Sequence, residues 1–81
     1  MEFNTTDYGL IKIDLDEDND RGTAYLEKYG QFRKLFYESF FKYKFYFQDI
    51  TFTLHTNNDE FVLAATTTKI IGKINKGSLA E

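Results

Sequence analysis

An acidic loop is the first group of residues whose types and spacing could carry chemistry. Asp16, Asp18, Asp20 and Glu27 fall at positions 1, 3, 5 and 12 of a calcium-binding loop. The rest of that pattern fails, because Arg21 stands where the sharp turn needs glycine and the preceding segment reads as a strand. We therefore expect no metal site. The acids are interpreted as a solvated turn that faces the positive end of a following helix dipole.

Arg33 is a second candidate, because it is the one charge placed among aromatic residues. On a helical wheel it lies beside Phe36 and Phe40, whereas the other charges of the segment lie outside that apolar arc. A guanidinium in this position either extends past the rings to water or points into a cavity and holds an anionic ligand. Extension to water is the commoner case, and the sequence leaves both open.

His55 and three tyrosines complete the candidates. His55 is the only histidine, and imidazole suits proton transfer near neutral pH, although a surface histidine at a strand end is more usual. Tyr25, Tyr29 and Tyr43 could donate to an oxyanion, although such rings more often belong to a core. His55 and Tyr29 are the weak catalytic candidates. The chain has no nucleophile motif, P-loop or dinucleotide fingerprint, and we expect no cofactor.

A long amphipathic helix over residues 23–41 is predicted to position most of these side chains. Its apolar face is a row of aromatic residues that recur at spacings of four, three, four and four. They are Tyr25, Tyr29, Phe32, Phe36 and Phe40. At about 100° per residue they fall within roughly an 80° arc. Gly30 weakens the middle of this helix by up to about 1 kcal/mol relative to alanine.

The remaining segments alternate with a period of two, which predicts strands. Residues 8–15 form the first. Residues 43–55 form a second, whose alternation changes phase near Gln48 and Asp49, and a β-bulge or bend there would curve the sheet. A hairpin turn at residues 57–59 leads into return strands over 60–68 and 69–75. The predicted fold class is therefore α+β, with one long helix packed on a curved antiparallel meander.

Composition limits the classes of protein that remain. The chain of 81 residues is expected to be one domain, with no Cys for disulfides or thiolate metal sites. Its net charge is −3 and its cations are scattered, which argues against nucleic acid. Apolar runs are too short to span a membrane, and the first residues do not resemble a signal peptide, so we expect a cytoplasmic protein. A core this thin suggests a homodimer or higher homo-oligomer.

The order of several short motifs resembles a known family. Tyr8-Gly9-Leu10 precedes Arg21-Gly22-Thr23-Ala24, and the aromatic run 40–45, the pair Asp49-Ile50 and the segment 61–63 follow. From Gly22 to Gly77 this succession is similar to the SnoaL-like branch of the NTF2-like superfamily, in particular the phenazine-biosynthesis A/B-type proteins. The resemblance implies a cone-shaped sheet wrapped around helices, an apolar pocket and a dimer. The N-terminal helices and last strands of that family have no counterpart. The domain over 1–81 is therefore expected to be either a fragment of a longer protein or a reduced form that completes its sheet with a second chain, and no catalytic residue can be transferred.

Three functions follow from this reading. The first is an apolar small-molecule pocket, for an apolar or aromatic ligand, without assigned catalysis. Its expected lining residues are Tyr25, Tyr29, Phe32, Arg33, Phe36, Tyr43 and Phe45. The second is a small-molecule isomerase or cyclase that uses general acid–base catalysis. The third is an acidic protein–protein interaction module without a ligand. Whether the chain is an enzyme stays open at this point.

Overall fold

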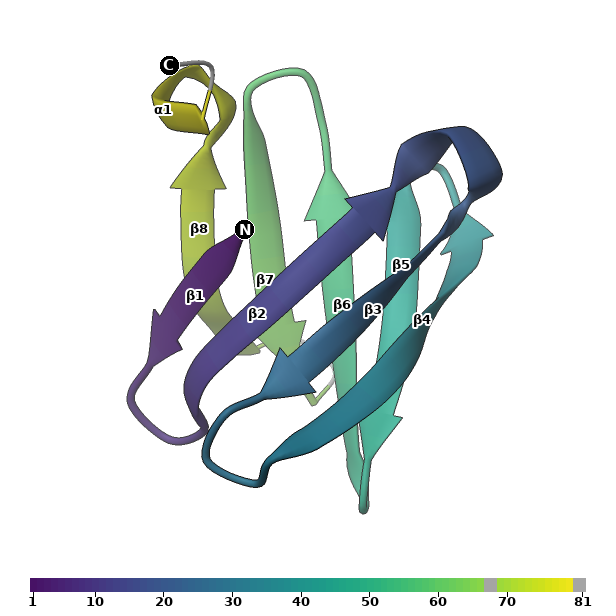
Figure 1. Cartoon of the computed structure of the whole chain (residues 1–81). Helices are drawn as coiled ribbons and strands as arrows, with labels where there is room; N and C mark the ends of the chain where they lie inside the picture. Colours follow the sequence, from purple (N-terminus) through teal and green to yellow (C-terminus); the bar gives the residue numbers. More distant parts are fainter. Residues whose placement is uncertain (67–68, 80–81) are drawn as a thin grey trace.

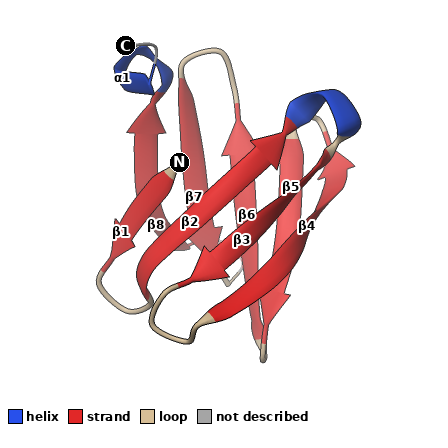
Figure 2. Cartoon of the chain, viewed as in Figure 1, coloured by secondary structure: helices blue, strands red, loops and turns tan. Residues whose placement is uncertain are grey.

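The chain folds into one antiparallel sheet of eight strands, and the computed structural model describes residues 1–66 and 69–79 of it. The strands lie in the sheet in their sequence order, and the sheet curls into a nearly closed barrel (Figures 1 and 2). The strands are β1 (Glu2–Thr5), β2 (Gly9–Asp16), β3 (Arg21–Leu26), β4 (Gln31–Ser39), β5 (Lys42–Phe47), β6 (Ile50–Thr56), β7 (Glu60–Ala65) and β8 (Lys69–Asn75). A 3₁₀ turn η1 (Glu17–Asn19) joins β2 to β3, and a single helical turn α1 (Lys76–Leu79) follows β8.

The long helix predicted over residues 23–41 is wrong. This segment contains most of β3, a turn and all of β4. In the turn, the amides of Tyr29 and Gly30 donate hydrogen bonds to the carbonyl of Leu26 at 3.0 and 2.7 Å, and Gly30 has a φ of 63°. That left-handed conformation is easy for glycine and ends any helix. The α+β class and the NTF2-like cone are therefore wrong as well, because the cone requires a helix packed against the sheet.

Several of the predicted strands are present in the structure. The segment 8–15 corresponds to β2, and 69–75 is β8. The change of phase near Gln48 and Asp49 is real, but its cause is a hairpin turn instead of a bulge. Gln48 has a φ of 54° in this turn, so the single curved strand predicted over 43–55 is the antiparallel pair β5 and β6. The hairpin turn predicted at residues 57–59 is confirmed between β6 and β7.

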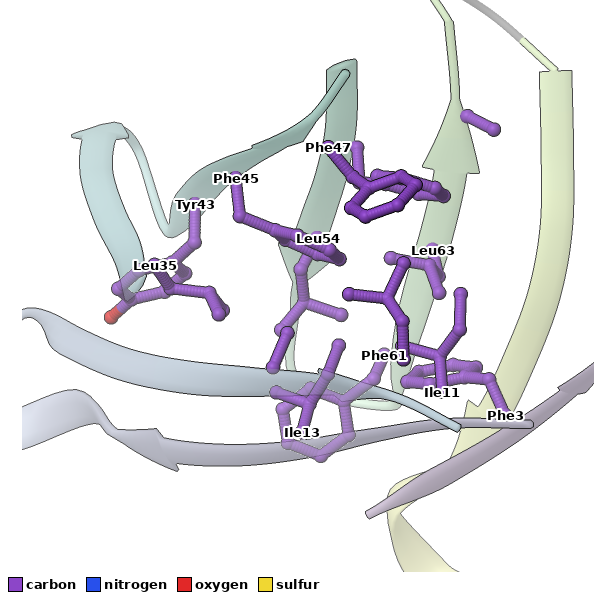
Figure 3. Close-up of a cluster of buried hydrophobic side chains, with 14 residues drawn as sticks. Phe3, Ile11, Ile13, Leu35, Tyr43, Phe45, Phe47, Leu54, Phe61 and Leu63 are labelled. Carbon is purple, nitrogen blue, oxygen red and sulfur yellow. The ribbon is translucent and has the colours of Figure 1, made fainter. Parts of the chain in front are cut away.

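The interior of the barrel is filled by side chains from alternate strand positions (Figure 3). The aromatic contributions are Phe3, Tyr43, Phe45, Phe47, Phe52 and Phe61. The rings of Phe45 and Phe52 come from facing positions on β5 and β6 and stack with centroids 4.8 Å apart and planes 8° apart. An eight-stranded barrel has an interior just wide enough for side chains, so these rings supply the packed core.

The first and last strands meet at a seam. β1 and β8 are in contact, but in the described residues no hydrogen-bonded ladder joins them. Inside the barrel, the ring of Phe3 on β1 packs against Gly72 on β8. A Cβ placed on Gly72 would lie 2.7 Å from Cδ1 of that ring, so glycine leaves the space that the ring needs. Asp7 and Lys69 form an ion pair of 2.9 Å at one end of the seam, and the hydrogen bond from Lys69 lowers the pKa of the Asp7 carboxyl.

In the part of the chain that the structure describes, no helix has the length and apolar character needed to cross a membrane.

Candidate interaction surface

The residues expected to line one apolar pocket lie in three different places. Tyr43 and Phe45 point into the barrel and are almost fully buried. Tyr25, Phe32 and Phe36 point outward from β3 and β4. Tyr29 and Arg33 lie near one end of the barrel. The structure therefore brings together subsets of these residues, and the core positions are in contact with other core side chains.

Arg33 lies where a cation meets an aromatic ring at the barrel end. Its position in β4 has the inward parity of Leu35. Its guanidinium carbon lies 5.4 Å from the centroid of Phe47, against which Tyr29 also packs at 4.4 Å. The guanidinium donates to the carbonyl of Phe32 at 3.1 Å and to the side-chain oxygen of Gln31. These contacts hold the cation at the rim of the core, with a cation–π geometry.

His55 lies on the outer face of β6, opposite Lys42 on β5. It is exposed, and Tyr29 is in the turn that joins β3 to β4, so the two weak catalytic candidates are on separate elements. The acidic residues from Asp16 to Asp20 surround η1. Among the described residues, no group of three or more histidine, cysteine, aspartate or glutamate side chains is arranged to hold a metal ion.

The most unusual surface is the outer face of β4. Phe32, Lys34, Phe36 and Glu38 point outward along this strand, and Phe40 follows in the next turn. We call these five residues the β4 outer row. Their phenylalanines are 70, 54 and 91% exposed. Isolated exposed apolar side chains are common, but a row of exposed aromatic residues on a domain of this size marks an interaction surface.

Neighbouring strands hold the β4 outer row in place. Tyr25 on β3 packs against Phe32 with centroids 4.8 Å apart, and the ammonium of Lys34 lies 5.9 Å from the Phe36 ring. On the other side, Glu38 forms ion pairs with Lys44 at 2.5 Å and Lys42 at 3.2 Å. The hydrogen bond from Lys44 lowers the pKa of the Glu38 carboxyl, and the same bond raises the pKa of Lys44. The row therefore has a fixed order of aromatic, positive and negative side chains.

The turn between β4 and β5 is strained. Phe40 and Phe41 occupy it with φ angles of 46° and 61°, and they are 91 and 62% exposed. Two-residue hairpin turns with positive φ strongly favour Asn-Gly, and a left-handed conformation costs bulky residues about 1–2 kcal/mol each. Strain of this kind points to a use for the side chains beyond folding.

The double substitution F40N/F41G is expected to raise the free energy of unfolding by about 1–2 kcal/mol, because it supplies the residues that this turn prefers. Urea denaturation followed by circular dichroism would measure it. Phe32→Asn is the matched control, since it replaces an exposed phenylalanine in a strand and is expected to give no gain. A loss of stability in F40N/F41G would contradict the assignment of strain.

Two hollows adjoin Phe32 on the outer face of β2 to β4. One has a volume of about 540 Å³ and is lined by Arg21, Thr23 and Lys34 among others. The other has a volume of about 530 Å³ and is lined by Lys12, Thr23 and Tyr25 among others. Each is large enough to receive an aromatic side chain. The β4 outer row therefore combines projecting rings with recesses beside them.

No protein-family model, no curated protein and no solved structure matches the chain. Together with the all-β fold, this finding shows that the assignment to the SnoaL-like branch of the NTF2-like superfamily is wrong. The sequence contains a signal for the β4 outer row. Its members Phe32, Lys34, Phe36 and Glu38 occupy every second position, which is the spacing of one face of a strand. The helical spacing of the aromatic residues concealed it.

Proposed function

We propose that this chain is a self-associating interaction module, in which two copies pack their β4 outer rows against each other. The observation that carries the proposal is the order of the row, which is aromatic, positive, aromatic, negative, aromatic. This is the interaction-module function expected from the sequence, combined with the expected homodimer. The surface is now the outer face of β4.

The order of the row matches itself under one twofold axis. If the axis passes through Phe36, lies between the sheets and is perpendicular to β4, the two β4 strands run antiparallel. Lys34 of each copy then faces Glu38 of the other, and Phe32 faces Phe40. An isologous contact requires this relation, in which residue i meets j and j meets i. Both charged pairs are attractive in this arrangement.

The alternative twofold axis, parallel to β4, is disfavoured by the same residues. It would place Lys34 opposite Lys34 and Glu38 opposite Glu38. Like charges that face each other are destabilising. The charge pattern therefore selects one of the two ways in which two copies of the strand can pack face to face.

Size and shape also support a second copy as the occupant. At roughly 200 Å² per ring, the exposed fractions of Phe32, Phe36 and Phe40 offer about 430 Å². A stable interface buries about 800 Å² per partner, so these rings would supply about half of it. In this arrangement the turn that carries Phe40 of one copy lies over the start of β4 in the other, where Phe32 is located. The hollows beside Phe32 can receive Phe40.

The cations beside the axis have acidic neighbours within the same copy. Arg21 faces Asp16 in the β2–β3 ladder, and Lys44 is paired with Glu38. Because these acidic neighbours partly neutralise Arg21 and Lys44, the two cations repel the cations of the second copy only weakly.

The test of this proposal is a charge exchange across the axis. Lys34→Glu and Glu38→Lys each convert two attractive pairs into repulsive ones, and each is expected to weaken self-association roughly 10- to 100-fold. An equimolar mixture of the two variants restores attraction in both pairs, so a heterodimer is expected at the wild-type affinity within a few-fold. Sedimentation velocity over a range of concentrations would measure all three samples.

The controls separate association from folding. Lys73→Glu makes the same charge change on the exposed face of β8 and is expected to leave association unchanged. Thermal unfolding of Glu38→Lys checks that losing its pairs with Lys42 and Lys44 leaves the domain folded. A folded wild-type chain that stays monomeric, or a mixture that associates no better than either variant alone, would overturn the proposal.

The other expectations remain predictions. The residues expected to bind an apolar ligand lie apart in the structure, which favours the interaction module over the small-molecule pocket and the acid–base enzyme. The cytoplasmic location also stays a prediction.

A further inference from the structure

A second feature, independent of self-association, is a polar groove on the outer faces of β5 and β6. It has a volume of about 360 Å³. Its walls and floor come from these two strands and the turns beside them. The lining residues are Lys42, Lys44, Asp49, Thr51, Thr53, His55 and Thr66.

The antiparallel ladder between β5 and β6 arranges the residues of the groove in cross-strand pairs, each of which we call a rung. Lys42 faces His55 and Lys44 faces Thr53 in the antiparallel register. All four residues line the groove, and both ammoniums are paired with the Glu38 carboxylate on the β4 side of it. An ammonium and a hydroxyl donate hydrogen bonds, and imidazole has at least one N–H in either protonation state. The adjoining positions on β7, Val62 and Ala64, add no charge to this part of the groove.

Thr53 forms the floor. Although it faces outward, it is only 6% exposed, because its neighbours rise around it. Its hydroxyl makes no hydrogen bond to another side chain or main-chain group among the residues that the structure describes. A threonine hydroxyl on the floor of a groove can donate to or accept from a ligand directly.

The charge balance of the two rungs favours an anion. Lys42 and Lys44 share one carboxylate, that of Glu38, with each ammonium on a separate oxygen. Two cations with one acid leave a surplus of one positive charge, and each ammonium has three N–H donors. The lysine side chains are 34 and 29% exposed, so both ammoniums remain accessible to a ligand from solvent. Asp49 lies at the far end of the ladder, about 13 Å along the strands from the Lys44 rung.

From this geometry we infer that the groove binds a phosphate group, held by Lys42, Lys44, Thr53 and His55. A tetrahedral dianion offers several acceptor oxygens to donors that approach from two strands, which matches two ammoniums, a hydroxyl and an imidazole. A carboxylate has only two oxygens and would leave donors of the second rung unused. The phosphate can belong to a free small molecule or to a lipid headgroup.

The experiment is a titration of the ¹⁵N-labelled chain followed by amide chemical shifts. Inorganic phosphate is expected to shift amides of β5 and β6 with a dissociation constant on the order of millimolar. Lys44→Gln and Thr53→Val are each expected to weaken this binding at least fivefold, and Thr53→Val does so without changing charge or shape. Lys73→Gln, on the exposed face of β8, is the control and is expected to bind as the wild type.

Titrations with other anions and with lipid vesicles test whether the groove prefers phosphate and whether the phosphate belongs to a small molecule or to a lipid headgroup. Chloride at matched ionic strength and acetate are expected to cause much smaller shifts. Vesicles that contain phosphatidic acid test the headgroup, and binding to them or to inorganic phosphate supports the site when Thr53→Val weakens it. Equal shifts in wild type and Thr53→Val, equal shifts with chloride, or no binding in either phosphate arm would overturn the inference. Because the monomer contains the whole groove, the Lys34→Glu variant is expected to bind phosphate normally, which separates this result from the proposed self-association.

Discussion

Phe45→Ala is expected to lower the free energy of unfolding by about 3–5 kcal/mol, the largest effect of any substitution considered. Phe45 is fully buried and stacks on Phe52 across the β5–β6 ladder. Its removal leaves a cavity at the centre of a core that a domain of this size cannot repack from elsewhere. Since small domains have only about 5–15 kcal/mol of stability, the variant would be partly unfolded at room temperature if the wild type lies at the lower end.

Tyr46→Ala is the matched control, because Tyr46 is the next residue of the same strand. Urea denaturation would measure the free energy of unfolding of both variants. Tyr46 points outward from the same strand and is 51% exposed, so its truncation is expected to cost less than about 1 kcal/mol. Similar losses in the two variants would mean that the alternation of β5 is wrong.

Gly22→Ala is expected to cost about 1–3 kcal/mol, although it adds only one methyl group. A Cβ on Gly22 would lie 2.6 Å from the carbonyl oxygen of Asp14 and 3.1 Å from Cα of Leu15. Both atoms belong to the backbone of β2, so a side-chain rotation cannot relieve the contact. The strand itself has to move.

Thr23→Ala is the control for this substitution, because Thr23 is exposed on the adjacent position of β3. Its expected cost is below about 1 kcal/mol. The two variants should also differ in where they perturb the protein, and Gly22→Ala is expected to shift the amide resonances from Asp14 to Asp16. Resonances of β2 that stay unchanged, with full stability, would contradict the close approach of the two strands.

The sequence allowed most strands to be predicted but concealed the pair β3 and β4. In β2, β5 and β6 most inward residues are apolar and most outward ones are polar, so the period of two is visible. On β4 the outward positions carry Phe32 and Phe36, while the inward position next to them holds Arg33. The usual polarity of a strand is therefore reversed, and the exposed rings happened to repeat with a helical spacing. Gly30, interpreted as a weak point in a helix, is the residue that makes the turn.

The candidate surface was missed for the same reason. Because large aromatic residues are usually buried, the sequence pattern predicts Phe32 and Phe36 on a buried helical face. Their exposure depends on the absence of any layer over β4, which is a tertiary property. The lysines and threonines of the phosphate groove gave no motif either, because Lys42 and His55 become neighbours only through the β5–β6 register.

The order of the strands has a consequence for how the chain acquires its structure. Within residues 1–66 and 69–79, every hydrogen-bonded ladder joins strands that are consecutive in sequence, so each can form after closing only a short loop. Folding rates fall as contacts become more distant in sequence, and this arrangement is therefore expected to fold faster than β proteins built from crossing connections. The contact of β1 with β8 is the exception, since it spans nearly the whole chain. Packing of Phe3 over Gly72 is expected to be among the last events, after the hairpins are in place.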